Sequence, residues 1–396
     1  MDDQWDGELM NLYKPYEEGT LQLRDLFSSH NEHRIFFTRI MNLSIYILNG
    51  NRWDPMLVIR IQSILASLIP VLIVYFLYKN QKIPLSSIIF FAIIGSVPIL
   101  YENLISGFQN QFYFMQIFLI LAISRFNARL STKDFLLIAT FGICAYFSMA
   151  GGLLIIFLSA LFYCYCYVFV KRKNILMLYA FILLLFTIIL YQITNQPEDH
   201  KTLKSSSFLE FITSIYTFLD YPRFGIFFIW LPTAFVLLKT IQKNLTTSFH
   251  FWFSLSILGF IVVTSFSRGH SLNVYSHNRY FENSIFIIFV LCSCFDIIFK
   301  SFKKIKYLNL SIIVSLIIVA VTFNLKALKE NKRSQLAVKN YHEYFHLEAN
   351  KKGSGAIFYS SIKNIDGLVY PSSTVILSFF QDATALKILE KSGLAQ

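Results

Sequence analysis

Apolar residues dominate the chain from position 56 to position 324, in long runs that short polar connections interrupt. A helix needs about 20 mostly apolar residues to cross the hydrocarbon core of a membrane. The runs therefore predict an all-α polytopic membrane protein with about ten transmembrane helices. We expect these helices at 56–78, 84–101, 110–124, 134–149, 152–170, 175–193, 224–238, 249–266, 282–299 and 307–324.

The segments on either side of this body have a different pattern. Residues 1–55 are polar and acidic and include an amphipathic stretch at 35–48, so we expect a first loop that lies outside the membrane. Residues 325–396 predict a small soluble tail with a charged helix near its start and a second helix near its end. The helical spacing of apolar residues in 207–221 predicts a further helix along the membrane interface.

Composition supports the membrane interpretation. Hydrophobic residues make up 55% of the chain, charged residues only 15%, and the mean hydropathy is +0.53. This excludes intrinsic disorder and a water-soluble enzyme. The net charge of +12 does not indicate nucleic-acid binding, because many basic residues lie in short connections between apolar runs.

These basic connections alternate along the chain with acidic or mixed ones. The positive-inside rule places the basic connections in the cytoplasm, so ten crossings put both termini of this chain outside. The basic residues are Lys79, Lys82, Arg125, Arg129, Lys133, Lys171, Arg172, Lys173, Lys239, Lys243, Lys300, Lys303, Lys304 and Lys306. An acidic outer segment directly after the first residue leads us to expect a further helix upstream, for eleven in all.

Two outer motifs lie in the first loop. The sequence DDQWDGE holds Asp2, Asp3, Asp6 and Glu8, which could act as a general base or bind a divalent cation, or form a solvated acidic turn. The sequence HNEHR holds groups that can exchange protons near neutral pH, unless it merely caps the following helix. Its candidate residues are His30, Glu32, His33 and Arg34, and on a helix the two histidines would share a face.

Two more motifs lie between predicted helices on the same side. Glu102, Gln109 and Gln111 crowd one short connection, where polar groups form either a hydrogen-bonded hairpin or a wet cavity. Arg268, Arg279 and Tyr280 lie near helix ends in SRGHSLNVYSHNRYFEN. Arginine binds phosphate with a planar fork of donors, although these arginines could instead extend their heads to the interface.

A carboxylate-rich first outer loop, a polytopic helical body and a late outer arginine resemble the GT-C class of membrane glycosyltransferases. The motifs DDQWDGE, HNEHRIFFTRI, NGNRWDP, ENLISGFQNQF, SHNRYFEN and VYPSS resemble a family of bacterial polytopic membrane proteins described as glycosyltransferase-like. This resemblance covers nearly the whole chain. It implies a location in the bacterial cytoplasmic membrane.

The GT-C resemblance also implies a reaction. A polyprenyl-phosphate-linked sugar would be the donor, and a cell-envelope glycan or lipid on the outer face the acceptor. Asp2 or Asp3 would be the base in a single inverting displacement, and Arg268 and Arg279 would hold the phosphate. Asp6, Glu8, Glu32, His30 and His33 would assist or bind the acceptor. Two alternatives stay open, namely a transporter or flippase of lipid-linked glycan and a non-enzymatic, truncated component of a polysaccharide assembly.

Overall fold

The structure is a computed structural model that describes residues 5–81, 107–127, 130–194, 197–221, 225–242, 246–275 and 382–392, together with positions 103 and 287. This part of the chain is mostly helical. The helices predicted at 84–101, 282–299 and 307–324 lie outside the described residues, as does the charged helix predicted near the start of the tail.

The first loop folds into a group of short elements. They are the π-helix η1 (Trp5–Tyr13), α2 (Lys14–Glu17), α3 (Leu23–Leu26), the strands β1 (Ser29–His30) and β2 (His33–Arg34), and the amphipathic helix α4 (Phe36–Leu48). The strands pair antiparallel, with His30 opposite His33. The two histidines therefore lie on paired strands and not on a helix, and α4 begins at Phe36.

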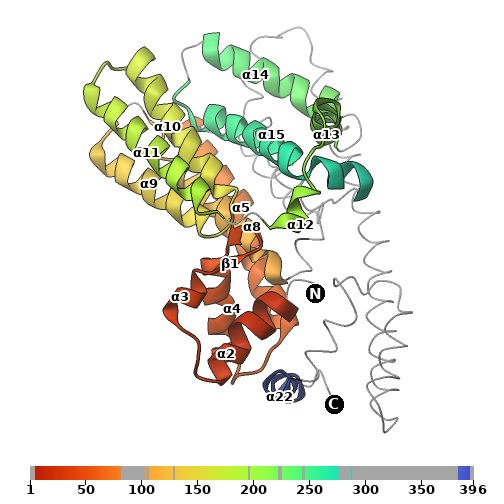
Figure 1. Ribbon diagram of the computed structural model, residues 1–396. Coiled ribbons are helices and arrows are strands. Elements are labelled where there is room, and N and C mark those ends of the chain that lie inside the picture. Colours follow the sequence, from red (N-terminus) through yellow and green to blue (C-terminus); the bar gives the residue numbers. More distant parts are fainter. Residues whose placement is uncertain are drawn as a thin grey trace.

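The C-terminal helix α22 (Ala383–Lys391) packs on this group. Its Asp382 accepts hydrogen bonds from the backbone amides of Thr384 and Ala385 as an N-cap, and it also pairs with Lys14 of α2. The Lys14 ammonium lowers the pKa of Asp382, and Asp382 raises that of Lys14. The buried residues of this small core are Leu9, Leu12, Tyr13, Tyr46, Trp53, Ala385, Ile388 and Leu389. The two ends of the described chain therefore share one core (Figure 1).

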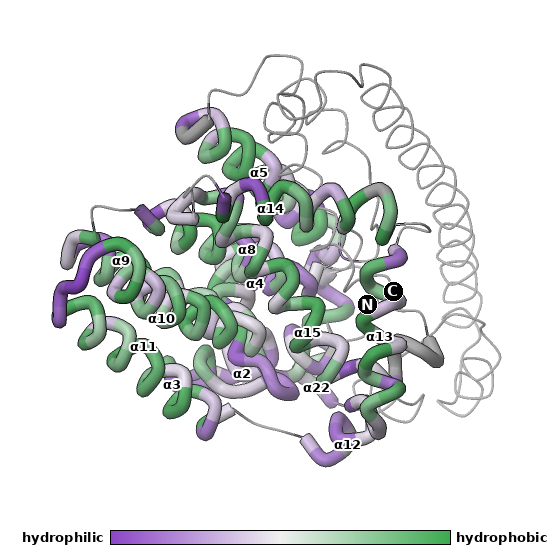
Figure 2. Tube along the Cα trace, turned by 90° about the horizontal axis from the view of Figure 1, so that it is seen from above, coloured by the Kyte–Doolittle hydropathy of each residue, from purple (hydrophilic) through white to green (hydrophobic). Residues whose placement is uncertain are grey.

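The helical body begins with α5 (Pro55–Gln81), followed by α8 (Asn110–Ile123), which η2 (Gly107–Gln109) precedes, then α9 (Thr132–Tyr146), α10 (Gly152–Phe169) and α11 (Asn174–Gln192). Gly152 allows the close turn between α9 and α10, because a Cβ there would overlap the backbone of Ala145 and Tyr146. Figure 2 shows α9, α10 and α11 side by side and apolar along most of their length.

The remaining described elements are α12 (Glu198–Lys201), α13 (Phe208–Asp220), the π-helix η3 (Ile226–Trp230), α14 (Leu231–Gln242) and α15 (Phe249–Tyr275). The helix predicted at 207–221 is thus present as α13, with Ser207 as its N-cap. It packs along the C-terminal half of α15, where Phe211 contacts Phe266 with ring centroids 6.4 Å apart.

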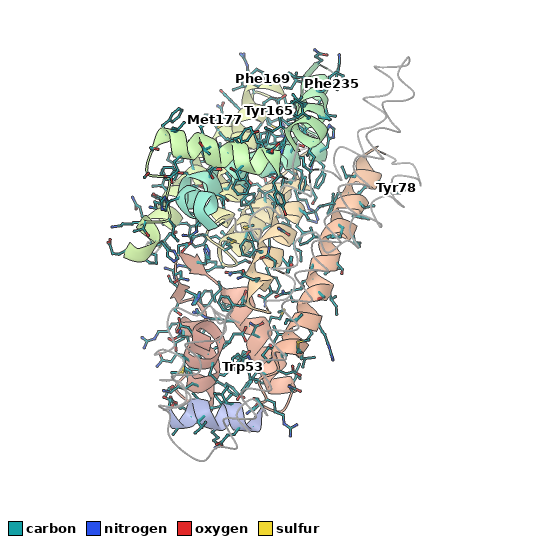
Figure 3. All side chains as sticks on the ribbon, turned by 90° about the vertical axis from the view of Figure 1, so that its right-hand side faces the viewer. Trp53, Tyr78, Tyr165, Phe169, Met177 and Phe235 are labelled. Atoms are coloured by element: carbon teal, nitrogen blue, oxygen red, sulfur yellow. The ribbon has the colours of Figure 1, made fainter. Side chains whose placement is uncertain are left out.

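Four helices of the described part are long and apolar enough to cross a membrane: Pro55–Lys79, Gly152–Phe169, Asn174–Gln192 and Phe249–His270. The predicted helices at 110–124, 134–149 and 224–238 are also helical, as α8, α9 and η3 with α14. In Figure 3, α5 extends from near Trp53 beside α22 to Tyr78 at the far end, where Tyr165, Phe169 and Phe235 also lie.

Helices α8, α9, α10 and α11 alternate in direction. The start of α10 and the end of α11 contact the HNEHR hairpin through Ala150 and Ile193, and the end of α9 contacts Phe36 at the start of α4 through Phe147. At their other ends, α8 and α9 are joined by the connection that carries Arg125, and α10 and α11 are joined by the connection that carries Lys171–Lys173. The connection between α14 and α15 follows Lys239. The basic connections of the described part therefore lie at the end of the helices opposite to the hairpin, as the charge pattern predicts.

Candidate functional site

Two arginines hold the segment that precedes the hairpin. The short helix α3 leaves its last carbonyl groups without helical partners. Arg39 Nη1 donates to the carbonyls of Asp25 at 2.8 Å, Leu26 at 3.3 Å and Ser28 at 2.6 Å. Arg34 Nη1 donates to the carbonyl of Phe27 at 2.9 Å, and its Nη2 donates to Ile193 at the end of α11 at 3.1 Å.

Arg39 is only 2% exposed, and burial lowers its pKa to about 10, which leaves the guanidinium charged at neutral pH. A buried charge of this kind needs hydrogen-bond partners, and the carbonyls of α3 supply them. The hairpin is thereby fixed to both α4 and α11.

The hairpin turn places Glu32 at its tip. Asn31 has φ of 54°, in the left-handed region that asparagine adopts more readily than most residues. The two strands on either side align His30 with His33. His33 Nδ1 accepts a hydrogen bond from the backbone amide of Ala150 at 3.4 Å, so the tip sits against the α9–α10 connection.

A second segment reaches the same place from the α11–α13 connection. We call residues 197–207 the strap. Ser205 donates from its backbone amide to Phe266 at 3.0 Å and from its hydroxyl to Ser265 at 2.7 Å. The backbone amide of His270 donates to Leu203 at 3.2 Å. Gly269 makes this approach possible, because a Cβ there would overlap Ser205 Oγ.

The hairpin, the strap and α15 meet in an ionic group that we call the Glu32 cluster: Glu32, His33, His200 and Arg268. Arg268 Nη2 donates to Glu32 Oε1, and His200 Nδ1 contacts Glu32 Oε2. His33 Nε2 lies 3.5 Å from Glu32 Oε1, and Arg268 Nη2 lies 3.3 Å from His200 Nδ1. One carboxylate is thus surrounded by a guanidinium and two imidazoles.

The side chains of the Glu32 cluster are between 10% and 26% exposed. They are sheltered enough for strong electrostatic interactions and still open to a ligand. A carboxylate and two imidazoles can exchange protons, and a guanidinium can bind an oxyanion. This combination suits transfer of an oxygen-linked group from an anionic donor.

A second ion pair lies beside the strap, between α13 and α15. His270 Nδ1 lies 2.7 Å from Glu210 Oε1, and the backbone and hydroxyl of Ser206 both donate to Glu210 Oε2. The Ser206 amide, together with His270, lowers the pKa of the Glu210 carboxyl. This pair joins the start of α13 to the end of α15 and helps to hold the strap.

Glu8 of DDQWDGE is 1% exposed and lies in a different, buried network. Its carboxylate accepts from Trp53 Nε1 at 2.9 Å, Asn42 Nδ2 at 3.0 Å and Tyr13 Oη at 3.3 Å. Asn42 Oδ1 in turn accepts from Asn110 Nδ2 at 3.0 Å. Burial, and after it Glu8, raises the pKa of Tyr13. This network joins η1 to α4, α8 and the segment before α5.

The other predicted site residues are distributed as follows. Asp6 accepts from Asn11 Nδ2 at 2.9 Å, and the ring of His30 packs against Phe108 with centroids 4.9 Å apart. Gln109 and Gln111 are buried at the start of α8, 5% and 4% exposed. Asp2, Asp3, Glu102, Arg279 and Tyr280 lie outside the described residues.

The structure therefore brings together three of the predicted residues, Glu32, His33 and Arg268, and adds His200. Sequence reasoning missed His200, which lies in an acidic and basic stretch with no motif around it. The only available signal was its position in a connection between predicted helices that is long enough to fold back. Within the described part, no group of three or more His, Cys, Asp or Glu side chains could hold a metal ion.

No protein-family model matches this chain, and no curated protein or solved structure is significantly similar to it.

Proposed function

We propose that the protein is a membrane glycosyltransferase of the GT-C type. It transfers a sugar from a polyprenyl-phosphate donor to a cell-envelope glycan or lipid, at the membrane face that carries the Glu32 cluster. The observation that carries this proposal is the convergence of Glu32, His33, His200 and Arg268 from three separate segments at one end of apolar helices.

The proposed reaction is a single inverting displacement. The acceptor hydroxyl attacks the anomeric carbon, the bond from that carbon to the phosphate oxygen breaks, and the phosphate leaves with the bonding electrons. A carboxylate takes the hydroxyl proton, and Arg268 stabilises the negative charge on the leaving phosphate. Bases of this kind contribute roughly 10²–10⁴-fold to rate, and preorganised donors about 10²–10³-fold.

Two carboxylate positions compete for the role of base. Glu32 is the carboxylate of the described cluster, whereas the resemblance assigns the base to Asp2 or Asp3. His33 and His200 are placed to relay or hold the proton, since both contact Glu32. Arg279 and Tyr280 are proposed to complete the donor site.

The topology proposed with this function has about ten crossings, the cluster face outside and the basic connections in the cytoplasm. Both ends of the chain lie on the cluster side, in keeping with the packing of α22 on the first loop. In the four described candidate spans, charged side chains lie near the ends, at Arg60, Lys79 and Arg268. A transporter is the weaker alternative, because transporters commonly place charged groups near the midplane.

Deleting the gene and profiling surface glycans by mass spectrometry tests the proposal. We expect the loss of one sugar decoration, its restoration by the wild-type gene, and no restoration by an Asp2→Asn/Asp3→Asn variant if that pair is the base. A flippase would instead leave the decorated lipid intermediate trapped on the inner leaflet. An unchanged glycan profile in the deletion strain would refute the enzyme.

A further inference from the structure

The Glu32 carboxylate occupies a position that suits an external anion. It lies against Arg268, His200 and His33, which approach from α15, the strap and the hairpin. Arg268 as a whole is 8% exposed, so its guanidinium is held in a built environment and not on an open surface. A guanidinium beside imidazoles is the donor set that binds a phosphate group.

We propose that Arg268, His200 and His33 form a phosphate-binding site that the chain's own Glu32 occupies in the ligand-free state. A phosphate on the donor displaces Glu32 from Arg268, so that phosphate binding releases the carboxylate. This inference rests on the proposed function, because it identifies the phosphate of the donor as the ligand. It adds a residue, His200, and a competition between substrate and protein for one guanidinium.

The competition follows from charge. A phosphate carries more negative charge than a carboxylate and offers more acceptor oxygens to a guanidinium. Phosphate and the Glu32 carboxylate repel each other, so both cannot sit on Arg268 without a cost in free energy. Once released, Glu32 loses its strongest cationic partner and becomes a better proton acceptor. Glu32, as one of the two candidate bases, is therefore fully active only when the donor is bound.

The fixed framework of the site supports this exchange. The strap is held to α15 through Ser205 and Leu203, and the hairpin is held by Arg34 and Arg39, so the basic groups stay in place when the Glu32 side chain moves. Only a side-chain rotation at the hairpin tip is required.

The test measures the affinity of the purified full chain in detergent for two probes, inorganic phosphate and geranyl monophosphate. The Glu32→Gln variant should bind phosphate at least about tenfold more tightly than wild type, because a like charge has been removed. Adding Arg268→Gln to it should abolish this gain, and adding His200→Asn should reduce it severalfold. Lys201→Gln in the same background is the matched control and should leave the gain intact, because the exposed Lys201 lies next to His200 in sequence but pairs with Glu198 and not with the cluster.

Two further arms identify the source of the phosphate and guard against misfolding. Tighter binding of geranyl phosphate than of inorganic phosphate indicates a lipid-linked ligand, and equal binding indicates a free phosphate. If Glu32→Gln fails to fold, Glu32→Asp withdraws the carboxylate by one methylene and should show a smaller gain. Unchanged or weaker phosphate affinity in a folded Glu32 variant overturns the competition, whatever the glycan profile shows. If a Glu32 variant gains phosphate affinity but the deletion strain has an unchanged glycan profile, the phosphate site stands and the proposed glycosyltransferase activity is overturned.

Discussion

At the scale of single residues, the acidic motif at the start of the chain separates into groups with different tasks. Glu8 lies buried among Trp53, Asn42 and Tyr13, whereas Asp6 pairs with Asn11 near the surface. The sequence showed four carboxylates in seven residues but not which would be buried, because that depends on contacts with α4 and α8. A buried carboxylate with three donors stabilises the fold of the first loop.

We expect Glu8→Gln to destabilise the protein by about 1–3 kcal/mol. The new amide would place an N–H donor against another donor, either Trp53 Nε1 or Asn42 Nδ2. Asn42 cannot relieve this by rotating its amide, because its Oδ1 accepts from Asn110. The measurement is thermal unfolding of the detergent-solubilised protein. Glu18→Gln, at a half-exposed position with one ion pair of 3.9 Å, is the control and should change the midpoint little. Equal midpoints for the two variants would contradict the network.

At the scale of elements, the strap is the part that delivers His200 to the cluster. The strap can approach α15 closely because Gly269 has no side chain. Helix α13 directly follows the strap in the sequence and packs along α15. The amphipathic pattern predicted α13, because helical periodicity is a local property of the sequence. It did not predict the contact between His200 and Glu32, which joins residues 168 positions apart. The hairpin at HNEHR likewise has no periodic signal in the sequence. It depends on the left-handed conformation of Asn31 and on the hydrogen bonds of Arg34 and Arg39.

The Gly269→Ala variant should displace the strap. The added methyl group would overlap Ser205 Oγ, so Lys201 and Lys204 should become more accessible to trypsin in membrane vesicles. Gly259→Ala on the same helix is the matched control, because its methyl group would meet only the flexible tip of Leu154 at 3.1 Å. Adding Ser205→Ala should partly restore protection in Gly269→Ala. Identical cleavage rates for the two glycine variants would show that the strap does not depend on this contact.

At the scale of the whole molecule, the two ends of the described chain and the Glu32 cluster lie on one side of the helices, and the described basic connections lie on the other. Hydropathy anticipated the apolar helices of the body, since it reflects the transfer of residues into the bilayer. These patterns could not predict that α22 packs on the first loop. An apolar helix face shows that a partner is needed, but it does not show which part of the chain supplies it.

This arrangement predicts how the chain reacts with a membrane-impermeant maleimide. Exposed cysteines at Glu18→Cys and Lys387→Cys should be labelled from the same side of the membrane in intact cells. Arg172→Cys, in the connection after α10, should be labelled only after the cells are opened. Labelling of Glu18→Cys and Lys387→Cys from opposite sides would contradict an even number of crossings between the first loop and α22.

The most direct test of the central claim is complementation of the deletion strain with Glu32→Gln at matched membrane abundance, with the surface glycan measured by mass spectrometry. The Glu32 cluster, as a site of glycosyl transfer, predicts loss of at least 99% of the decoration, in line with the roughly 10²–10⁴-fold contribution of a general base. Glu18→Gln should restore it fully. Full restoration by Glu32→Gln would contradict a catalytic role for the cluster.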